Sequence, residues 1–526
     1  MSRDGHPFPA VSARKPDPAS GPGRAAPNRR TMKTLFAFVA VVSLLCLALV
    51  RLGSPSSPGD GEPLTLYCAA GIRLAVEPAV RAFEQETGAI VHIQYGGSGS
   101  LLGQLQVDGD AADLYLPGDE GYLDAARDQG LIAEILPLAS MRPVLAVAHG
   151  NPHQIDSMEE VLEKDLPFAL GSPAAAAVGR VVRKVYSERG QWQEIEGKAK
   201  VFQPTVTELA TSLAIGQVDA AIVWDATVTQ FDGLDLVRLP ELEAVPVRVA
   251  VGVLTMSPRA ASALQLARYL QAHDRGQAHF LAAGLTPVEG DTWAARPEVL
   301  VYAGSMFHSA LEETLTTWAR REGVELIRVY NGCGILVAQM RAGGEPDAFF
   351  ACDSSFMDDV QQRFDSRVLL SNNPLVMITA PGNPLQLKGL GDLARPGLRV
   401  GLAHPEHSAL GRLTRQQMEQ ENLAADFASS GNLKQDAPQG DFLVNALLTG
   451  ALDATVVYIS NAALAGAKID RVPLAPTALA EQPFAMARQS DQRYLLQRLF
   501  DAVTSSGSQD RFAELGFDWR FGEDSQ

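Results

Sequence analysis

The stretch YGGSGSLLGQLQVDGDAADLYLPGD, residues 95–119, decides the fold because the chain carries it twice. Its counterpart is YNGCGILVAQMRAGGEPDAFFACD, residues 330–353. Each has the pattern of a strand end, a glycine loop, a helix and a short strand of small residues that ends in Asp. Within the loop, Ser98 of the first stretch corresponds to Cys333 of the second.

The similarity extends well beyond this loop. The segment LYCAAGIRLAVEPAVRAFEQETGAIVHIQY, residues 66–95, is echoed by LVYAGSMFHSALEETLTTWARREGVELIRVY, residues 300–330. Later segments also correspond, as in AIGQVDAAIVWDA and LLTGALDATVVYIS. A chain of 526 residues is longer than a single core usually supports. We therefore expect two copies of one domain, at residues 63–290 and 298–522.

Charge is distributed unevenly along the chain. The first 62 residues carry eight Lys/Arg and four acids, a net charge of +4. Since the whole chain has a net charge of −17, the remainder carries −21. Because nucleic-acid binding depends on clustered Lys and Arg, this acidic body argues against a nucleic-acid partner.

The N-terminal region predicts export. Residues 1–31 are basic and rich in Pro and Gly, so we expect them to be disordered. Residues 32–52 hold the uncharged run LFAFVAVVSLLCLALV between Lys33 and Arg51, which fits a signal peptide or a short membrane anchor. No clear cleavage site follows, so we favour an anchor in the inner membrane, with the rest of the chain in the periplasm or otherwise outside the cytoplasm.

Alternating strand and helix patterns predict an α/β fold in each copy. In AVEPAVRAFEQETG, the residues Val76, Val80 and Phe83 share one helix face, and Gly88 ends the helix. Strand-helix alternation implies a parallel sheet covered by helices on both faces, with ligands bound beyond the carboxyl ends of the strands.

The glycine loops lie where such ligands bind. A helix N-terminus preceded by glycines presents unpaired N–H groups and a partial positive charge, so it holds an oxyanion without Lys or Arg. The alternative is a tight strand-to-helix turn with Ser98 as the N-cap. The glycine spacing fits neither a dinucleotide fingerprint nor a phosphate loop.

The order of these loops resembles the periplasmic molybdate-binding protein family of ABC transporters. The resemblance rests on AAG or AGS, GSGSLxxQ, ADLYLPGD, GxPAxxxxGR and GxxDAAIVW, and it covers nearly the whole of both copies. It implies a type II periplasmic binding fold, in which two lobes enclose a cleft and crossing strands form a hinge. In that family backbone N–H groups and hydroxyls hold the anion, without a positively charged ligand.

The resemblance also implies ligand-binding positions. The first-loop serine falls on Gly71 and Ser305, the second-loop serine on Ser98 and Cys333, and the tyrosine on Trp224 and Tyr458. The implied binding set is Ala70, Gly71, Ser98, Val178, Val206 and Trp224 in the first copy, and Gly304, Ser305, Cys333, Leu410, Gly440 and Tyr458 in the second. Neither copy keeps both serines and the tyrosine, which leaves the ligand open among oxyanions and small organic acids.

Other constellations suggest competing sites. The HPEH segment, residues 404–407, suggests a metal site through His404, Glu406 and His407, but no further ligand can be assigned to it. Tyr302, Tyr330 and Tyr458 suggest a ferric site, but the adjacent tyrosine pair of such sites is missing. Arg180 and Arg412 either pair with an anion or lie on solvated helix faces.

Two further patterns involve carboxylates and cysteines. The pairs Asp113 with Asp119 and Asp347 with Asp353 resemble the paired carboxylates of acid-base catalysis but have no nucleophile beside them. We expect Cys333 and Cys352 to be free thiols, with a disulfide at the cleft edge as the alternative.

The sequence therefore predicts a tethered solute-binding protein with no catalytic residue, metal or cofactor. We expect it to capture a small oxyanion, molybdate or tungstate first, and to deliver it to an ABC permease. The partners would be this anion, the permease and the membrane contacted by the N-terminal segment. A membrane-tethered sensor or scaffold with degenerate binding domains is the alternative, as is a binder of sulfate, phosphate or a small organic acid.

Overall fold

The computed structural model describes residues 62–109, 112–474 and 477–522. The expectations for residues 1–31 and 32–52 thus fall outside the described residues. Within the described ranges, no helix has the length and apolar composition that a membrane crossing needs.

The first copy begins with a six-stranded sheet in the order β11-β4-β10-β3-β1-β2. Strand β1 pairs in parallel with β2 and β3, whereas β10 runs antiparallel to β3 and β4. The sheet is therefore mixed: β1, β2 and β3 are parallel, as expected, whereas β10, which brings the chain back from a second lobe, runs antiparallel to its neighbours. The strands are β1 (Leu64–Ala69), β2 (Val91–Gly96), β3 (Leu114–Leu116), β4 (Ile132–Met141), β10 (Val247–Leu254) and β11 (Thr286–Pro287).

The second lobe of this copy is built on a five-stranded sheet in the order β7-β6-β8-β5-β9. Its strands are β5 (Pro143–Ala148), β6 (Phe168–Gly171), β7 (Val201–Gln203), β8 (Ala220–Trp224) and β9 (Leu234–Val237). Arg142 alone separates β4 from β5. Its N–H donates to the Asp225 carboxylate at 3.0 Å, and the Asp225 N–H donates to its carbonyl at 2.8 Å, which fixes the crossing between the lobes.

In the second copy both lobes share one ten-stranded sheet. The corresponding crossing is a single long strand, β15 (Val368–Thr379), which pairs with β20 and β21 at its start and with β18 and β19 at its end. The other strands are β12 (Glu298–Gly304), β13 (Glu325–Asn331), β14 (Ala348–Phe350), β16 (Val400–Ala403), β17 (Leu433–Ala437), β18 (Ala454–Tyr458), β19 (Asp470–Pro473), β20 (Leu479–Met486) and β21 (Asp518–Trp519).

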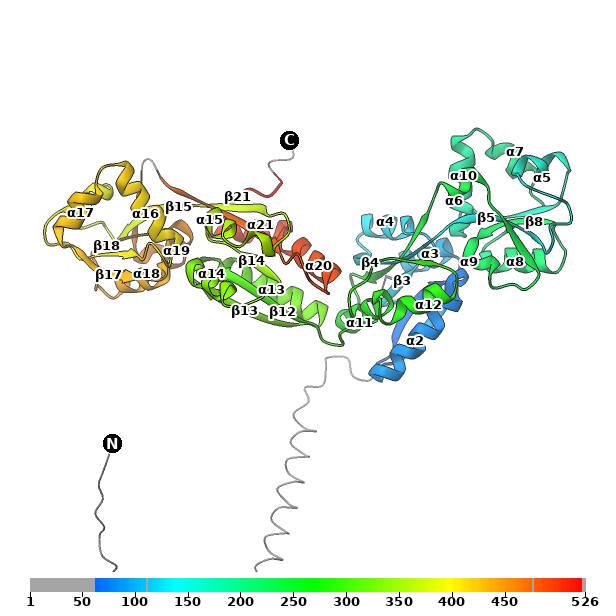
Figure 1. Cartoon of the computed structure of the whole chain (residues 1–526), viewed down its shortest axis with the longest axis horizontal. Helices are drawn as coiled ribbons and strands as arrows, with labels where there is room; N and C mark the ends of the chain where they lie inside the picture. The colour runs from blue at the N-terminus through cyan, green and yellow to red at the C-terminus, as the bar shows by residue number, and fades with distance from the viewer. Residues whose placement is uncertain (1–61, 110–111, 475–476, 523–526) are drawn as a thin grey trace, which may run out of the picture. The chain divides into compact units, whose positions relative to one another are not determined.

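Helices flank the sheets on both sides, as the sequence pattern predicts. In the first lobe, α3 and α4 lie on one side of the sheet and α2, α11 and α12 on the other (Figure 1). The main helices of the first copy are α2 (Arg73–Thr87), α3 (Ser98–Val107), α4 (Gly121–Asp128), α5 (Met158–Glu163), α6 (Ala177–Glu188), α7 (Trp192–Lys198), α8 (Val206–Ala214), α9 (Asp225–Val228), α10 (Pro240–Glu243), α11 (Ala260–Gln271) and α12 (Gly276–Ala282), with the 3-10 turn η1 (Ala70–Ile72).

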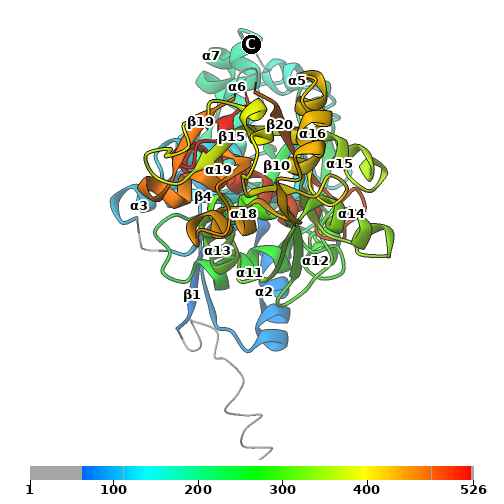
Figure 2. The same cartoon turned by 90° about the vertical axis from the view of Figure 1, so that its left-hand side faces the viewer.

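The helices of the second copy follow the same order. Figure 2 shows α16, α18 and α19 around the second-lobe strands, where α19 contacts β15 and α18 contacts β18. They are α13 (His308–Glu322), α14 (Cys333–Arg341), α15 (Ser354–Asp358), α16 (Ala409–Gln420), α17 (Ala424–Ser430), α18 (Gly440–Leu448), α19 (Ile459–Ala465), α20 (Arg493–Val503) and α21 (Ser506–Glu514), with the 3-10 turn η2 (Ser305–Phe307).

Each copy has its own hydrophobic core. One cluster of buried residues draws on residues 64–285, and the other on residues 299–519. Helix α2 illustrates the packing: Val76, Val80 and Phe83 are buried, and Gly88 adopts a positive φ of 76° that ends the helix, as predicted. The repeat in the sequence is therefore also a repeat of the core.

Candidate ligand-binding sites

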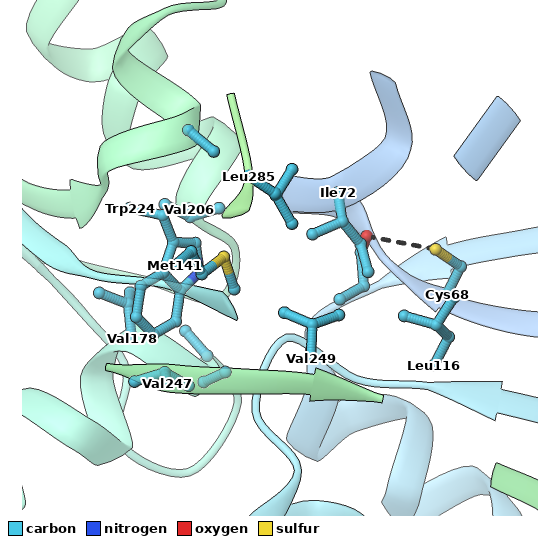
Figure 3. Packing of buried hydrophobic residues seen from close by; sticks show 14 of the residues in the cluster. Cys68, Ile72, Leu116, Met141, Val178, Val206, Trp224, Val247, Val249 and Leu285 are labelled. Atoms are coloured by element: carbon cyan, nitrogen blue, oxygen red, sulfur yellow. Dashed lines mark hydrogen bonds between the residues drawn. The ribbon is translucent and has the colours of Figure 1, made fainter. Parts of the chain in front are cut away.

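The first copy contains a small cavity between its lobes, where strand ends meet helix starts. The cavity measures about 20 Å³. All six residues that the sequence implied for this copy line it: Ala70, Gly71, Ser98, Val178, Val206 and Trp224. Figure 3 shows Trp224, Val206 and Val178 close together, with Met141 beside them. The remaining lining residues are also small or apolar, and none carries a charge.

Three helices direct their N-termini at this cavity. Helices α3 and α6 begin there without any hydrogen bond from a capping side chain, and α8 begins with a capping box formed by Thr205 and Glu208. The first N–H groups of a helix have no partner within the helix, and they carry the positive end of its dipole. These N-termini therefore place partial positive charge at this edge of the fold without a basic side chain.

Ser98 supplies the hydroxyl of the cavity. It is the first residue of α3, and Gly97 is the N-cap, so the alternative of Ser98 as a capping residue is wrong. The buried Ser98 Oγ instead accepts the Gly118 N–H at 3.0 Å, and the Tyr115 hydroxyl donates to the Ser98 carbonyl at 2.7 Å. The Ser98 O–H is held in place and remains free to donate.

Trp224 supplies a second donor. It ends strand β8, is buried, and lines the cavity. A Cβ placed on Gly118 would lie 3.7 Å from its Nε1 atom, so the indole N–H lies next to the Ser98–Gly118 contact. Among the described residues, Nε1 has no hydrogen-bond partner.

Glycines allow the lobes to close over the cavity. A Cβ on Gly97 would lie 2.4 Å from the Pro204 carbonyl oxygen, and one on Gly99 would lie 1.9 Å from the Ala174 oxygen. The Gly99 N–H also donates to the Ala175 carbonyl at 2.9 Å. These contacts join the first lobe to the second, so the glycines serve close approach between lobes as well as the turn.

The same close approach occurs in the second copy. A Cβ on Gly332 would lie 2.7 Å from the His407 oxygen, and one on Gly334 would lie 2.5 Å from the Glu406 oxygen. The HPEH segment therefore serves as the facing wall of the second lobe. Within the described part of the chain, no group of three His, Cys, Asp or Glu residues is arranged to hold a metal.

Arg180 and Arg412 form equivalent ion pairs across the lobes. The Arg180 Nε lies 3.0 Å from an Asp119 oxygen, and the Arg412 Nη2 lies 2.6 Å from an Asp353 oxygen. Each guanidinium also stacks on an aromatic ring. Arg180 does not line the cavity, so these arginines hold the lobes together, which neither sequence interpretation anticipated.

The aspartates that resemble paired catalytic carboxylates each have a partner of their own. Asp113 is buried and binds the Arg259 guanidinium at 2.9 Å, while the Asp347 carboxylate accepts the Leu300 N–H at 2.8 Å. The residues therefore tie strands and helices together.

The second copy differs at the position of Ser98. Cys333 and Cys352 form a disulfide, so the expectation of free thiols is wrong and Cys333 has no S–H to donate. The Cys352 N–H lies 2.9 Å from the Cys333 sulfur, which repeats the Gly118–Ser98 contact of the first copy. A Cβ on Gly304 would lie 2.5 Å from the Cys352 sulfur, so the disulfide packs against the first loop.

Tyr458 ends strand β18, as Trp224 ends β8. Its hydroxyl is buried and unpaired among the described residues, and burial raises its pKa well above the usual value. Gly440 begins α18, where a Cβ would lie 3.3 Å from Leu410. The structure thus places Gly304 beside Cys333, and Gly440 beside Leu410.

Sequence reasoning missed Gly118 and Asn461, and it gave Cys352 only as the partner of Cys333 in an alternative disulfide. Gly118 and Cys352 occupy the same position of the ADLYLPGD repeat, so an alignment of the two copies contained the signal for both. Asn461 lies one turn beyond Tyr458, and its Oδ1 atom is buried without a partner near Gly440. No sequence motif marks it.

The two copies each match one protein family. Residues 64–286 and residues 299–518 both match the family described as bacterial extracellular solute-binding protein. A Haemophilus influenzae protein is 30% identical over 228 residues, which cover 43% of this chain and 91% of that protein. The molybdate-binding protein ModA of Mycobacterium tuberculosis is 26% identical over 234 residues, which cover 43% of this chain and 87% of ModA.

Solved structures of similar architecture match about one copy in length. The periplasmic molybdate-binding protein of Azotobacter vinelandii has a TM-score of 0.38 and 21% identity, and covers 42% of this chain and 98% of its own. The sulfate-binding protein SubI of M. tuberculosis has a TM-score of 0.39 and 16% identity, and covers 43% of this chain and 88% of its own. The two tandem family matches span most of the chain, which therefore belongs to the bacterial extracellular solute-binding protein family.

Proposed function

We propose that the first copy captures a small, fully ionised oxyanion, molybdate or tungstate first, and passes it to an ABC permease. The observation that carries this proposal is the cavity lining, which combines helix N-termini, the Ser98 hydroxyl and the Trp224 indole with no charged side chain. Such a lining binds an anion by oriented dipoles, which cost no reorganisation when the lobes close.

The lining favours an anion that carries no proton. The Trp224 indole can only donate, and the Ser98 and Thr205 hydroxyl oxygens each already accept a backbone N–H, from Gly118 and Glu208, so the side-chain polar groups are better placed to donate than to accept. A protonated anion such as hydrogen phosphate brings an O–H that needs an acceptor, and an unpaired buried donor is costly. Molybdate, tungstate and sulfate need no acceptor at neutral pH.

The cavity size supports a compact ion. A volume of about 20 Å³ favours an ion with one shell of oxygens around a single central atom over a branched organic acid. Among the remaining candidates, the size therefore favours a tetrahedral oxyanion.

The second copy supports a different role. Its disulfide replaces the hydroxyl donor with sulfur atoms that have no hydrogen. We therefore propose that it binds these oxyanions more weakly than the first copy or not at all, and serves as a degenerate domain for contact with a partner.

Residues 32–52 extend the proposal to the location of the protein in the cell. Their apolar run between basic residues supports export and retention at the inner membrane. Fractionation of cells that make the full chain tests this idea. Recovery of the chain in a salt-washed membrane fraction is expected, and release as a soluble periplasmic protein would contradict the anchor.

Calorimetry on the full-length chain with molybdate, tungstate, sulfate and phosphate tests the ligand. Ser98→Ala should weaken binding of the preferred anion about 10- to 100-fold, because a hydrogen bond to a charged group contributes about 1.5–3 kcal/mol. Ser100→Ala, at an exposed position of the same helix, is the matched control and should bind like the wild type. Absence of binding for all four anions would refute the proposal.

A further inference from the structure

The second copy has hydrogen-bond acceptors at positions where the first copy is apolar or can only donate. Tyr458 ends β18 as Trp224 ends β8, so a hydroxyl that can accept replaces an indole that cannot. Asn373 of β15 occupies the position of Met141 of β4, which lies beside Trp224 (Figure 3). The Tyr458 hydroxyl and the Asn373 Oδ1 atom are both buried without a hydrogen-bond partner in the described part of the chain.

Asn461 of α19 supplies a third acceptor. Its Nδ2 atom donates to Asp441 Oδ1 at 2.8 Å, which fixes the amide and leaves the Asn461 Oδ1 atom buried and unpaired among the described residues. This oxygen would lie 2.6 Å from a Cβ on Gly440. Val206, which the first copy has at that position, lines the cavity. The Asn461 oxygen therefore lies at the wall of the second copy's cleft.

The backbone donors that hold an anion are still present in this copy. Helices α14, α16 and α18 all begin without a hydrogen bond from a capping side chain, so their first N–H groups carry partial positive charge. The disulfide has removed the side-chain donor at Cys333. Compared with the first copy, the cleft has lost a side-chain donor, kept the helix N-termini and gained acceptors.

Buried polar atoms without a partner are costly, and native proteins keep few of them. A fully ionised oxyanion brings only acceptors, so it cannot pair with an amide oxygen. An oxyanion that carries a hydroxyl group can donate to that oxygen while its other oxygens accept from the helix N-termini.

We infer that the second copy is a separate site for a tetrahedral oxyanion of the hydrogen phosphate type, with Asn461, Tyr458 and Asn373 supplying acceptors that fully ionised oxyanions cannot satisfy. The inference goes beyond the proposed function, which gives this copy weak or no binding of fully ionised oxyanions. The two copies then sort tetrahedral anions by protonation: the first takes ions without a proton, and the second takes ions with one.

Calorimetry on the full-length chain saturated with molybdate tests the inference, with inorganic phosphate as the probe. Molybdate occupies the first copy, so we expect one further phosphate per chain and no displacement of molybdate. Sulfate has the same shape but no proton at neutral pH. It should bind the molybdate-saturated chain at least about tenfold more weakly than phosphate, because it leaves the buried acceptors unpaired.

Two variants assign the phosphate to this cleft. Asn461→Leu removes the acceptor at similar size and should weaken phosphate binding about tenfold or more. Asn445→Leu, the same substitution at an exposed position of α18, is the matched control and should bind phosphate like the wild type. Tyr458→Phe removes a hydroxyl that has no partner, so it should weaken phosphate binding without lowering the melting temperature of the ligand-free protein. This variant keeps the test valid if Asn461→Leu is unstable.

The failure of this inference is distinct from the failure of the proposed function. Competition between phosphate and molybdate for one site would overturn the inference, as would equal affinity of the molybdate-saturated chain for sulfate and phosphate. Unchanged phosphate affinity in Asn461→Leu and Tyr458→Phe would overturn it too. If phosphate does not bind but molybdate does, only the inference falls. If molybdate does not bind but phosphate binds and both variants weaken it, the inference stands and the first copy's assignment falls.

Discussion

At the scale of single residues, Asp441 makes the stability of the second copy depend on pH. It follows Gly440 on α18, and its carboxylate accepts an N–H from Asn461 at 2.8 Å. Burial raises its pKa above the ordinary value, and this effect outweighs the opposing effects of the Asn461 hydrogen bond and of His308. The folded state therefore holds this proton more tightly than the unfolded state does.

The pKa shift predicts that Asp441 lowers stability at neutral pH. Stability from a raised pKa is fully present below the unfolded value of about 3.9, and is lost as the pH rises through the folded value. Asp441→Asn keeps an oxygen for the Asn461 donor and carries no charge. We expect a higher melting temperature than the wild type at pH 7, and a difference that shrinks towards pH 4. A constant difference across this range would contradict the assignment.

At this scale, the sequence predicted residues that line the first copy's cavity but not the contacts between the lobes around it. The glycine loops, Ser98 and Trp224 were predictable because the repeat and the strand-to-helix pattern mark them. The approach of Gly97 to the Pro204 carbonyl was not, because it depends on how closely two lobes approach. The Arg180–Asp119 pair was also missed, since either residue alone fits an exposed surface.

At the scale of elements, the two copies join equivalent helices and strands by different chemistry. In the first copy, the start of α3 is joined to the end of β3 by the Ser98–Gly118 hydrogen bond. In the second, the start of α14 is joined to the end of β14 by the Cys333–Cys352 disulfide. The sequence offered this bond only as the alternative to free thiols, because cysteine spacing gives no pairing rule and the folded arrangement decides it.

Replacing the Cys333–Cys352 disulfide by the Ser–Gly pair of the first copy should raise anion binding and lower stability. The variant Cys333→Ser with Cys352→Gly recreates the Ser98–Gly118 pair in the second copy. Loss of a disulfide that closes a loop of 19 residues should cost about 3 kcal/mol, or roughly 6–12 °C of melting temperature for a domain of this size. The new hydroxyl should raise molybdate binding from one ion per chain towards two, measured by calorimetry. An unchanged stoichiometry would show that the disulfide is not what limits this copy.

At the scale of the whole molecule, two separate hydrophobic cores share one chain. The residues of each cluster come from one copy only, within the described part of the chain. Cooperative unfolding follows a shared core, so each copy should melt as a unit of its own. A ligand stabilises only the unit that binds it.

Scanning calorimetry of the full-length chain therefore locates the ligand without dividing the protein. We expect two transitions, and molybdate at about 100 times its Kd should add about 2.7 kcal/mol to one of them. That gain corresponds to a rise of roughly 5–10 °C for a domain of about 220 residues. The shifted transition should belong to the first copy, so Ser98→Ala should reduce the shift, whereas the matched Tyr458→Phe variant should leave it unchanged. A shift of both transitions, or a loss of the shift in Tyr458→Phe, would place oxyanion binding in the second copy as well.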